Sequence, residues 1–430
     1  MRRFCCLLVL LFVVVNAAMA QETTPQSAVD YNARGLIRYN HRDYDGALAD
    51  FDKSIALDPG FWPSYMVRGN ARESKGDYDG AIADYNKAID LNPAFGRTYN
   101  DRGHARYQKG DYDGAMADLN KAIELDPESA PAYANRGRAR FSRADYDGAI
   151  ADYDKAIDLD PKADAYSGRG LARHAGNDLE GAIADFNGAI ILDANYAEAY
   201  RGRGDVRVQQ DDLDGAMADF DKALALNPNY ADAYRSRGIA RSNKGELEAA
   251  ISEFTKAIAI SPKLAPAYYD RAWNYLYQAK GDSAYADAVD YLRLTRADES
   301  GQFRLYMVIV GYFGLRQARK NGEAKAFIDA HALDFDTSDW PYLLMRYLRH
   351  EMAAPELLNL AVDKDKKTEV RARVYVGMDA SLLGQRELAL AHLRWVKENS
   401  TKPSREYTLA VSEITRLEAA PKPTPKRPQD

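Results

Sequence analysis

Residues 96–127 read GRTYNDRGHARYQKGDYDGAMADLNKAIELDP, and this stretch predicts two helices joined by a tight turn. The first helix is expected to end at Lys109, the letters GDYD form the turn, and the second helix begins at Gly114. Asp and Gly are favoured in turns because of their side-chain hydrogen bonding and backbone freedom. Pro127 cannot continue a helix and disfavours the helical conformation of the residue before it, so the second helix ends there.

The same pattern recurs along most of the chain, with steps of 34 residues and one step of 33 in the tyrosine register. That register comprises Tyr31, Tyr65, Tyr99, Tyr133, Tyr166, Tyr200, Tyr234 and Tyr268. The glycine register comprises Gly35, Gly69, Gly103, Gly137, Gly170, Gly204 and Gly238, and Ala272 continues it. Alanines and prolines follow two further registers, which start at Ala47 and Pro59. Agreement of four registers indicates stacked units that bury one continuous core.

The unit resembles the tetratricopeptide repeat, whose 34-residue signature places aromatic residues, glycine, alanine and proline in this order. Matching units start at Ala28, Trp62, Gly96, Ala130, Ala163, Ala197 and Ala231, and an eighth starts at Ala265 and then loses the register. The resemblance implies an all-α fold, an α-solenoid in which helix–turn–helix units form a right-handed superhelix. We therefore expect seven regular units over residues 28–264.

Each unit carries arginine where the family has leucine, and in most units a second arginine follows one helical turn later. The first set comprises Arg34, Arg68, Arg102, Arg136, Arg169, Arg203, Arg237 and Arg271. The second helix of the units carries one acid with the same period: Asp50, Asp84, Asp118, Asp152, Asp185, Asp219 and Glu253. Two arginines four residues apart that face one carboxylate favour an internal ion-pair ladder. The alternative is a basic strip that binds anions.

Residues 265–418 are expected to form a degenerate helical region that ends in a cap. Amphipathic segments are predicted at 283–295, 303–321, 323–332, 340–350 and 356–361, a weak repeat register returns from Val370, and a helix over 404–417 closes the stack. Short motifs here are similar to periplasmic tetratricopeptide lipoproteins of the NlpI (new lipoprotein I) type. They comprise Trp340-Pro341, Pro355-Glu356-Leu357-Leu358, Arg371-Ala372, Tyr375-Val376-Gly377, Gly384, Tyr407, Ala410, Glu413 and Leu417. This resemblance implies an adaptor role, but the lipid-anchor cysteine of that type is missing, so membrane attachment does not follow.

The two ends of the chain are predicted to be a targeting signal and a C-terminal tail. Residues 1–20 have a basic start, an apolar run over Phe4–Val15 and a small-residue cleavage pattern, as in a secretory signal peptide. A retained anchor is the alternative, although the run is shorter than the about 20 residues of a stable span. The expected product is a periplasmic chain that begins at Gln21 and has no stable membrane anchor. Residues 419–430 predict a disordered Pro/Lys-rich tail, with a docking peptide as the alternative.

Composition and motifs exclude several functions. The 430 residues include 58 Lys and Arg against 64 Asp and Glu, a net charge of −6, which argues against nucleic-acid binding. The two cysteines, Cys5 and Cys6, fall in the signal segment, so no disulfide framework is expected. The Gly202-Arg-Gly204 run lacks the third glycine of a phosphate loop, the DYDG turns lack the glutamate of a calcium loop, and no hydrolase or metalloprotease motif occurs. We expect a non-enzyme without cofactor or metal.

The face of each first helix that is not used in stacking is expected to line a groove for a partner. Residues at positions 2, 5, 9 and 12 of the units lie on this face and differ from unit to unit. The candidate groove residues are Asn32, Tyr39, Asn70, Asn100, His104, Tyr107, Arg138, Phe141, Arg201, Arg235, Tyr269 and Trp273. Asn and aromatic side chains suit a peptide backbone and its apolar groups, and Arg201 with Arg235 would bind an acidic group of the partner.

The sequence thus predicts an exported adaptor that binds other proteins or extended peptides and organises the bacterial envelope. The alternative is a binding protein for a glycan or peptidoglycan fragment, held by Tyr107, Phe141, Tyr269 and Trp273. The partner's identity and the oligomeric state stay open at this point.

Overall fold

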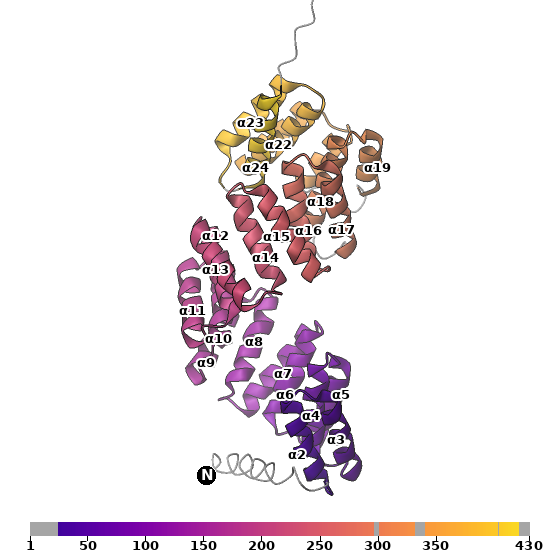
Figure 1. The fold of residues 1–430 in the computed structure, drawn as a ribbon, viewed down its shortest axis with the longest axis vertical. Coiled ribbons are helices and arrows are strands. Elements are labelled where there is room, and N and C mark those ends of the chain that lie inside the picture. The colour runs from indigo at the N-terminus through magenta and orange to yellow at the C-terminus, as the bar shows by residue number, and fades with distance from the viewer. Residues whose placement is uncertain (1–24, 296–300, 332–339, 403, 421–430) are drawn as a thin grey trace, which may run out of the picture. The chain divides into compact units, whose positions relative to one another are not determined.

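A computed structural model describes residues 25–295, 301–331, 340–402 and 404–420, so the predicted signal segment and most of the predicted tail lie outside the described residues. Every regular element within these ranges is an α-helix, and the all-α solenoid prediction is confirmed (Figure 1). The chain divides into two compact units, unit 1 ending at Val206 and unit 2 beginning at Arg207. Each unit is described by itself.

Unit 1 consists of antiparallel helix pairs. Its last helix, α12 (Ala197–Gln209), crosses the boundary, so that the final residues of this helix belong to unit 2. Its other helices are α2 (Ala28–Asn40), α3 (Tyr44–Leu57), α4 (Trp62–Ser74), α5 (Tyr78–Leu91), α6 (Gly96–Gln108), α7 (Tyr112–Leu125), α8 (Ala130–Ser142), α9 (Tyr146–Leu159), α10 (Ala163–Ala175) and α11 (Leu179–Leu192). The first helices of successive repeats, α4, α6 and α8, pack against one another.

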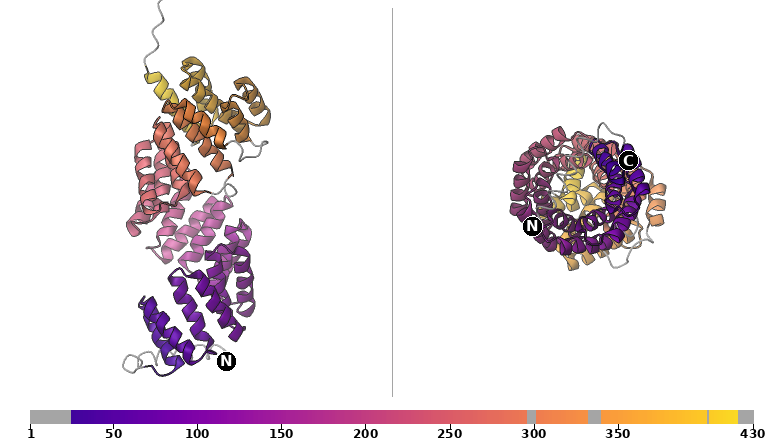
Figure 2. Two further views of the ribbon diagram at one scale, coloured as in Figure 1. Left: turned by 90° about the vertical axis from the view of Figure 1, so that its right-hand side faces the viewer. Right: turned by 90° about the horizontal axis from the view of Figure 1, so that it is seen from below.

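Unit 2 continues with helix pairs and ends in a more irregular set of helices, which Figure 2 shows from two sides. The helices of unit 2 that follow α12 are α13 (Leu213–Leu226), α14 (Ala231–Asn243), α15 (Leu247–Ile260), α16 (Ala265–Tyr277), α17 (Gly281–Leu294), α18 (Gly301–Gln317), α19 (Asn321–His331), α20 (Trp340–Leu348), α21 (Ala354–Lys364), α22 (Lys366–Leu382), α23 (Arg386–Asn399) and α24 (Arg405–Ala419).

In six of the regular repeats an aspartate sets the turn by capping the second helix, whereas Glu246 in the seventh makes no side-chain capping bond. The carboxylate of Asp111 accepts a hydrogen bond from the backbone N–H of Gly114 at 2.9 Å. The helix α7 therefore begins at Tyr112, and the prediction of a start at Gly114 was wrong by two residues because the capping role of the aspartate was read as turn. Gly110 before it has φ +82°, a left-handed conformation that glycine adopts without strain.

The repeated glycine lets the two helices of a repeat approach closely. A Cβ atom on Gly69 would lie 2.6 Å from the ring of Tyr85, and one on Gly103 would lie 2.9 Å from Cγ of Leu119. Both partner side chains are fully buried. A larger residue at Gly69 or Gly103 would overlap the side chain that fills the repeat.

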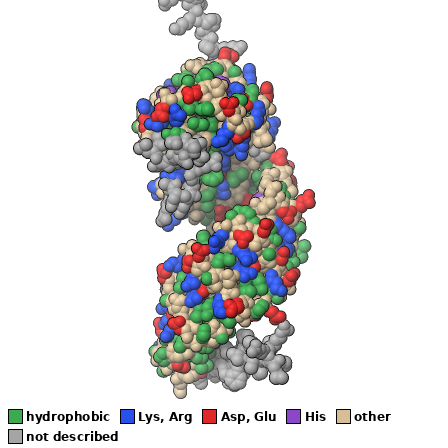
Figure 3. Space-filling model, turned by 180° about the vertical axis from the view of Figure 1, so that it is seen from behind, with side chains coloured by type: hydrophobic (Ala, Val, Ile, Leu, Met, Phe, Trp, Pro, Cys, Tyr) green, Lys and Arg blue, Asp and Glu red, His purple; other side chains and the backbone are tan. Residues whose placement is uncertain are grey.

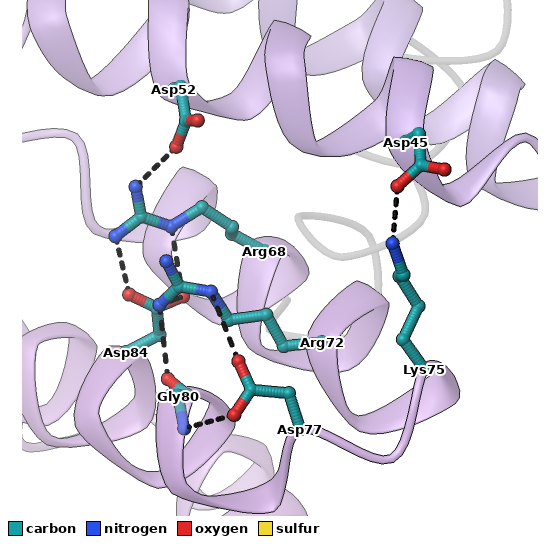
Figure 4. A network of polar contacts seen from close by, with 8 residues as sticks. All are labelled: Asp45, Asp52, Arg68, Arg72, Lys75, Asp77, Gly80 and Asp84. Atoms are coloured by element: carbon teal, nitrogen blue, oxygen red, sulfur yellow. Dashed lines mark hydrogen bonds and ion pairs between the residues drawn. The ribbon is translucent and has the colours of Figure 1, made fainter.

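Ion pairs connect the helices within and between repeats, and the acid of the pair within each repeat is buried. Nε and Nη2 of Arg68 donate to the two oxygens of Asp84 at 2.9 and 2.5 Å, and Nη1 of Arg72 donates to Asp84 at 2.7 Å (Figure 4). Nη1 of Arg68 also reaches Asp52 of the preceding repeat at 2.6 Å. The arrangement recurs at Arg34–Asp50, Arg102–Asp118, Arg136–Asp152, Arg169–Asp185, Arg237–Glu253 and Arg271–Asp287. The ion-pair ladder is confirmed at these pairs, and the arginines in them are structural.

The end of unit 2 differs in detail from its prediction. The helix expected to continue to Asn321 ends at Gln317, because Arg319 takes a left-handed conformation with φ +62°. The side chain of Ser404 caps α24, which packs against α16, α22 and α23, and this helix continues through Ala419 into the segment predicted as tail. Residues 421–430 of that tail lie outside the described residues.

None of the described helices has the length and apolar character needed to cross a membrane. Acidic and basic side chains are interspersed on the face drawn in Figure 3.

Candidate binding sites

Unit 1 contains a polar cleft of about 460 Å³ on the face formed by the first helices of successive repeats. We call it the unit 1 cleft. It is lined by Tyr39, Asn70, Glu73, Ser74, Tyr78, Asn100, Asp101, His104 and Asn135. Four of the predicted groove residues therefore come together here, namely Tyr39, Asn70, Asn100 and His104.

Hydrogen bonds within and between repeats hold the lining of the cleft in place. The hydroxyl of Tyr85 lies 2.7 Å from Oδ1 of Asn70 and 2.9 Å from Oε2 of Glu73. The other oxygen of Glu73 contacts Nδ1 of His104 on the next repeat. The amide of Asn135 donates to Oδ1 of Asn100 at 2.9 Å, so each repeat contributes a side chain that is fixed by its neighbour.

Asp101 is the carboxylate of the cleft that is least compensated. Its side chain is 16% exposed, Oδ1 accepts a hydrogen bond from Asn100 at 3.0 Å, and Oδ2 has no hydrogen-bond partner within the described chain. Arg97 lies 3.7 Å from Oδ2, beyond hydrogen-bonding distance. Burial raises the pKa of Asp101 to about 6, and Glu73 adds to this effect while Arg97 and His104 oppose it. At neutral pH a buried negative charge faces the cleft.

An Asp101→Asn variant is expected to be more stable than the wild type at pH 7.5 and equally stable at pH 4. Between pH 4 and 6 the folded chain keeps a proton that the unfolded chain has released, so the free energy of unfolding falls as pH rises. The ionised carboxylate costs about 1–3 kcal/mol above this window, and the amide removes that cost. Urea unfolding of both proteins at the two pH values measures the difference. Equal stability of the variant and the wild type at pH 7.5 would contradict the view that the ionised carboxylate of Asp101 destabilises the fold.

Unit 2 contains a second site, a cavity of about 380 Å³ enclosed mainly by α14, α16, α18, α22 and α24. We call it the unit 2 cavity. Asp270 lies between two arginines, with Nε of Arg235 at 2.7 Å and Nη2 of Arg405 at 3.7 Å. The guanidinium of Arg405 lies 4.6 Å from the ring centroid of Tyr269. Burial raises the pKa of Tyr269 to about 12, so its hydroxyl stays protonated at neutral pH.

The structure distributes the remaining predicted groove residues over several places. Arg235, Tyr269 and Trp273 line the unit 2 cavity, and Arg138 lines a smaller pocket of about 170 Å³. The carboxamide of Asn32 accepts a hydrogen bond from Ser64 at 2.9 Å and is buried.

Tyr107 and Phe141 take part in contacts between neighbouring elements of unit 1. The hydroxyl of Tyr107 lies 2.9 Å from Oγ of Ser142, and the ring of Phe141 packs against Tyr146. The four aromatic residues proposed for a glycan therefore belong to two different units, because Tyr269 and Trp273 lie in unit 2.

Arg201 and Arg235, which were expected to bind an acid of the partner, already contact acids of the chain. Arg201 pairs with Asp205 one turn away on α12, and Arg235 bonds to Asp270 on α16. Asp205 lies one turn from Arg201 in the same repeat, whereas Asp270 belongs to the repeat that follows Arg235 and is not apparent from a single repeat.

Several residues that line the two sites were not among the groove residues predicted from unit positions 2, 5, 9 and 12. Asp101, Asn135 and Asp270 stand at position 6 of their units, next to the predicted positions 5 and 9. Glu73 stands at position 12, which is one of the four predicted positions, but it was not included among the predicted groove residues. Arg405 comes from the C-terminal helix, and the repeat pattern gives no signal for its place.

Within the described ranges, no three His, Cys, Asp or Glu side chains come close enough to one another to hold a metal ion. The contacts of both sites are hydrogen bonds, ion pairs and ring contacts. These arrangements are suited to recognition of a polar ligand.

Sequence comparison assigns the repeats to a known family. Residues 69–110, 103–142, 137–176, 170–211 and 204–245 match the family model described as TPR repeat, and residues 231–264 match the model described as tetratricopeptide repeat. No curated protein matches the chain. The family prediction is confirmed for this part of the chain.

The chain is also similar to several solved structures, one of them with a TM-score above 0.5. The Cut9–Hcn1 hetero-tetramer of the APC/C is 16% identical with a TM-score of 0.53, and the match covers 68% of this chain and 57% of that chain. A tetratricopeptide repeat protein from Parabacteroides merdae is 21% identical with a TM-score of 0.48, covering 55% of this chain and 94% of its own. YrrB, described as a TPR protein with an unusual peptide-binding site, is 26% identical with a TM-score of 0.33, covering 43% and 95%.

Proposed function

Residues 69–264 are tetratricopeptide repeats, and we propose that the chain is a non-catalytic scaffold that binds an extended segment of a partner protein in the unit 1 cleft. The observation that carries this proposal is the state of Asp101. A buried carboxylate with a raised pKa and an unbonded oxygen lowers the stability of the fold, and such groups are typical of functional sites.

The chemistry of the cleft favours a partner segment with a basic side chain. Oδ2 of Asp101 is an acceptor without a donor within the described chain, and Nδ2 of Asn70 is a donor without an acceptor there. A Lys or Arg side chain would compensate the charge of Asp101, and a peptide carbonyl would accept from Asn70. The lining is already held by bonds between repeats, so little conformational entropy is lost on binding.

A peptide array tests this function, with each basic peptide paired with a copy in which Lys and Arg are replaced by Gln. Basic peptides are expected to bind the wild type better than their copies. The Asp101→Asn variant is expected to bind them about tenfold more weakly, because it loses an ion pair worth about 1.4 kcal/mol.

The matched control is Asp90→Asn, which removes an exposed carboxylate from α5 that does not line the cleft. It should leave the affinity unchanged. The proposal fails if both variants lose the same affinity, or if the basic peptides bind no better than their copies.

We further propose that the chain acts in the periplasm and organises proteins of the bacterial envelope. The support for export is the signal-like segment at residues 1–20, and the support for an envelope role is the similarity of the C-terminal third to adaptors of the NlpI type. N-terminal sequencing of the purified protein tests export, with Gln21 as the expected first residue.

A further inference from the structure

The unit 2 cavity has the size and the lining of a small-ligand site. Its volume of about 380 Å³ falls in the range of 300–1,000 Å³ that is common for such sites. Aromatic side chains from two helices form part of its wall: Tyr269, Trp273 and Tyr277 on α16 and Tyr306 on α18. The rings of Trp273 and Tyr306 lie 6.4 Å apart, measured between centroids.

The charged side chains that line the cavity include more arginines than carboxylates. Three guanidinium groups line it, those of Arg235, Arg371 and Arg405, against the two carboxylates of Asp270 and Glu406. Arg371 makes one long hydrogen bond, from Nε to Glu406 at 3.4 Å, and its guanidinium lies 5.8 Å from the ring centroid of Tyr306. Its terminal nitrogens have no hydrogen-bond partner in the part of the chain that the structure describes. Arg405 is 46% exposed and approaches Asp270 no closer than 3.7 Å. The cavity therefore offers N–H donors to an anion.

Several buried polar atoms of the cavity lack a hydrogen bond among the described residues, including one donor and one acceptor on adjacent residues. Trp273 and Asn274 are each 3% exposed, and Nε1 of Trp273 and Oδ1 of Asn274 have no hydrogen-bond partner among the described residues. An unsatisfied buried donor or acceptor costs about 1–3 kcal/mol. Nε1 of Trp273 is a donor and Oδ1 of Asn274 is an acceptor. A ligand hydroxyl group both accepts and donates a hydrogen bond, so it suits this pair of atoms.

We propose that the unit 2 cavity binds a sugar acid. Its carboxylate pairs with Arg371 and Arg405, because guanidinium groups bind carboxylates through charge-assisted and often paired hydrogen bonds. Its hydroxyls use the N–H of Trp273 and the carbonyl of Asn274, and the C–H faces of its ring pack on the aromatic wall. The source is either a free sugar acid or the acidic end of a glycan chain. This site is separate from the unit 1 cleft and does not depend on the function proposed for that cleft.

Calorimetric titration of the full chain with D-glucuronate tests the proposal, with D-glucose as a probe that has the same ring and no carboxylate. Glucuronate is expected to bind at least tenfold more tightly than glucose. Arg371→Gln and Arg405→Gln are each expected to weaken glucuronate binding about tenfold, the effect of losing about 1.4 kcal/mol. Methyl glucuronoside, with its anomeric oxygen blocked, distinguishes the sources: unchanged binding indicates a chain end, and loss indicates the free acid.

Arg373→Gln is the control for both arginine variants, because Arg373 also lies on α22, pairs with Glu369 at 2.8 Å and does not line the cavity. Its affinity for glucuronate should equal that of the wild type. No binding of glucuronate up to about 10 mM, equal affinity for glucose, or wild-type affinity in both Arg371→Gln and Arg405→Gln would overturn the proposal. Arg405→Gln changes a half-exposed side chain, so it reports on the site even if Arg371→Gln fails to fold.

Discussion

An Asp84→Ala substitution is expected to lower the free energy of unfolding by about 3–5 kcal/mol. Asp84 is 3% exposed and receives hydrogen bonds from both Arg68 and Arg72. Removing the carboxylate leaves two partly buried guanidinium groups beside an apolar methyl group. The remaining bonds of Arg68 to Asp52 and of Arg72 to the carbonyl of Gly80 compensate their desolvation only in part. Urea unfolding followed by far-UV circular dichroism measures the loss.

The matched control uses the other partner of the same arginine. Asp52 bonds to Nη1 of Arg68 at 2.6 Å but is 61% exposed, so Asp52→Ala is expected to cost no more than about 1 kcal/mol. Because repeats unfold in a nearly one-dimensional manner, the Asp84 variant should also broaden the transition. Similar losses in the two variants would contradict the view that burial gives the ladder its strength.

The sequence predicts the ladder because all of its members recur with the period of the repeat. Arg68 and Asp84 are 16 residues apart, as are Arg102 and Asp118, so one periodic pattern encodes the pair in each unit. Where the pattern changes, the geometry changes with it. Glu253 replaces the aspartate, and Arg237 then bonds to it through Nη2 alone while its Nε lacks a hydrogen bond within the described residues.

The two candidate sites were less predictable, because they are made by residues that break the period. Asp101 stands where the neighbouring repeats have Val67 and Asn135, and only its surroundings in the folded chain raise its pKa. Arg405 reaches the unit 2 cavity from a helix that follows a region without a clear repeat. Periodicity predicts which face of a helix lines a groove, but the depth and charge of a site depend on contacts between repeats.

A Gly281→Ala substitution is expected to destabilise unit 2 by about 3 kcal/mol or more, at the upper end of the cost of overpacking. A Cβ atom on Gly281 would lie 2.2 Å from the carbonyl oxygen of Gly314 and 3.0 Å from the backbone nitrogen of Ala318. Side chains can rotate away from a clash, but these are backbone atoms at the C-terminal end of α18 and directly after it, and their displacement would separate α17 from the core around it. The glycines of the regular repeats differ in this respect, since Gly69 faces the ring of Tyr85.

Gly322→Ala provides the control, because Gly322 lies in α19 and a Cβ atom there has no heavy atom within 4 Å. Alanine has a higher helix propensity than glycine by about 1 kcal/mol, so this variant should be as stable as the wild type or slightly more stable. Thermal unfolding of both variants, with the unit 1 variant Asp84→Ala measured beside them, also shows whether the loss stays within unit 2. If Gly281→Ala unfolds with the wild-type midpoint, α17 and α18 do not approach as closely as the structure indicates, and the packing of the irregular end of unit 2 would have to be revised.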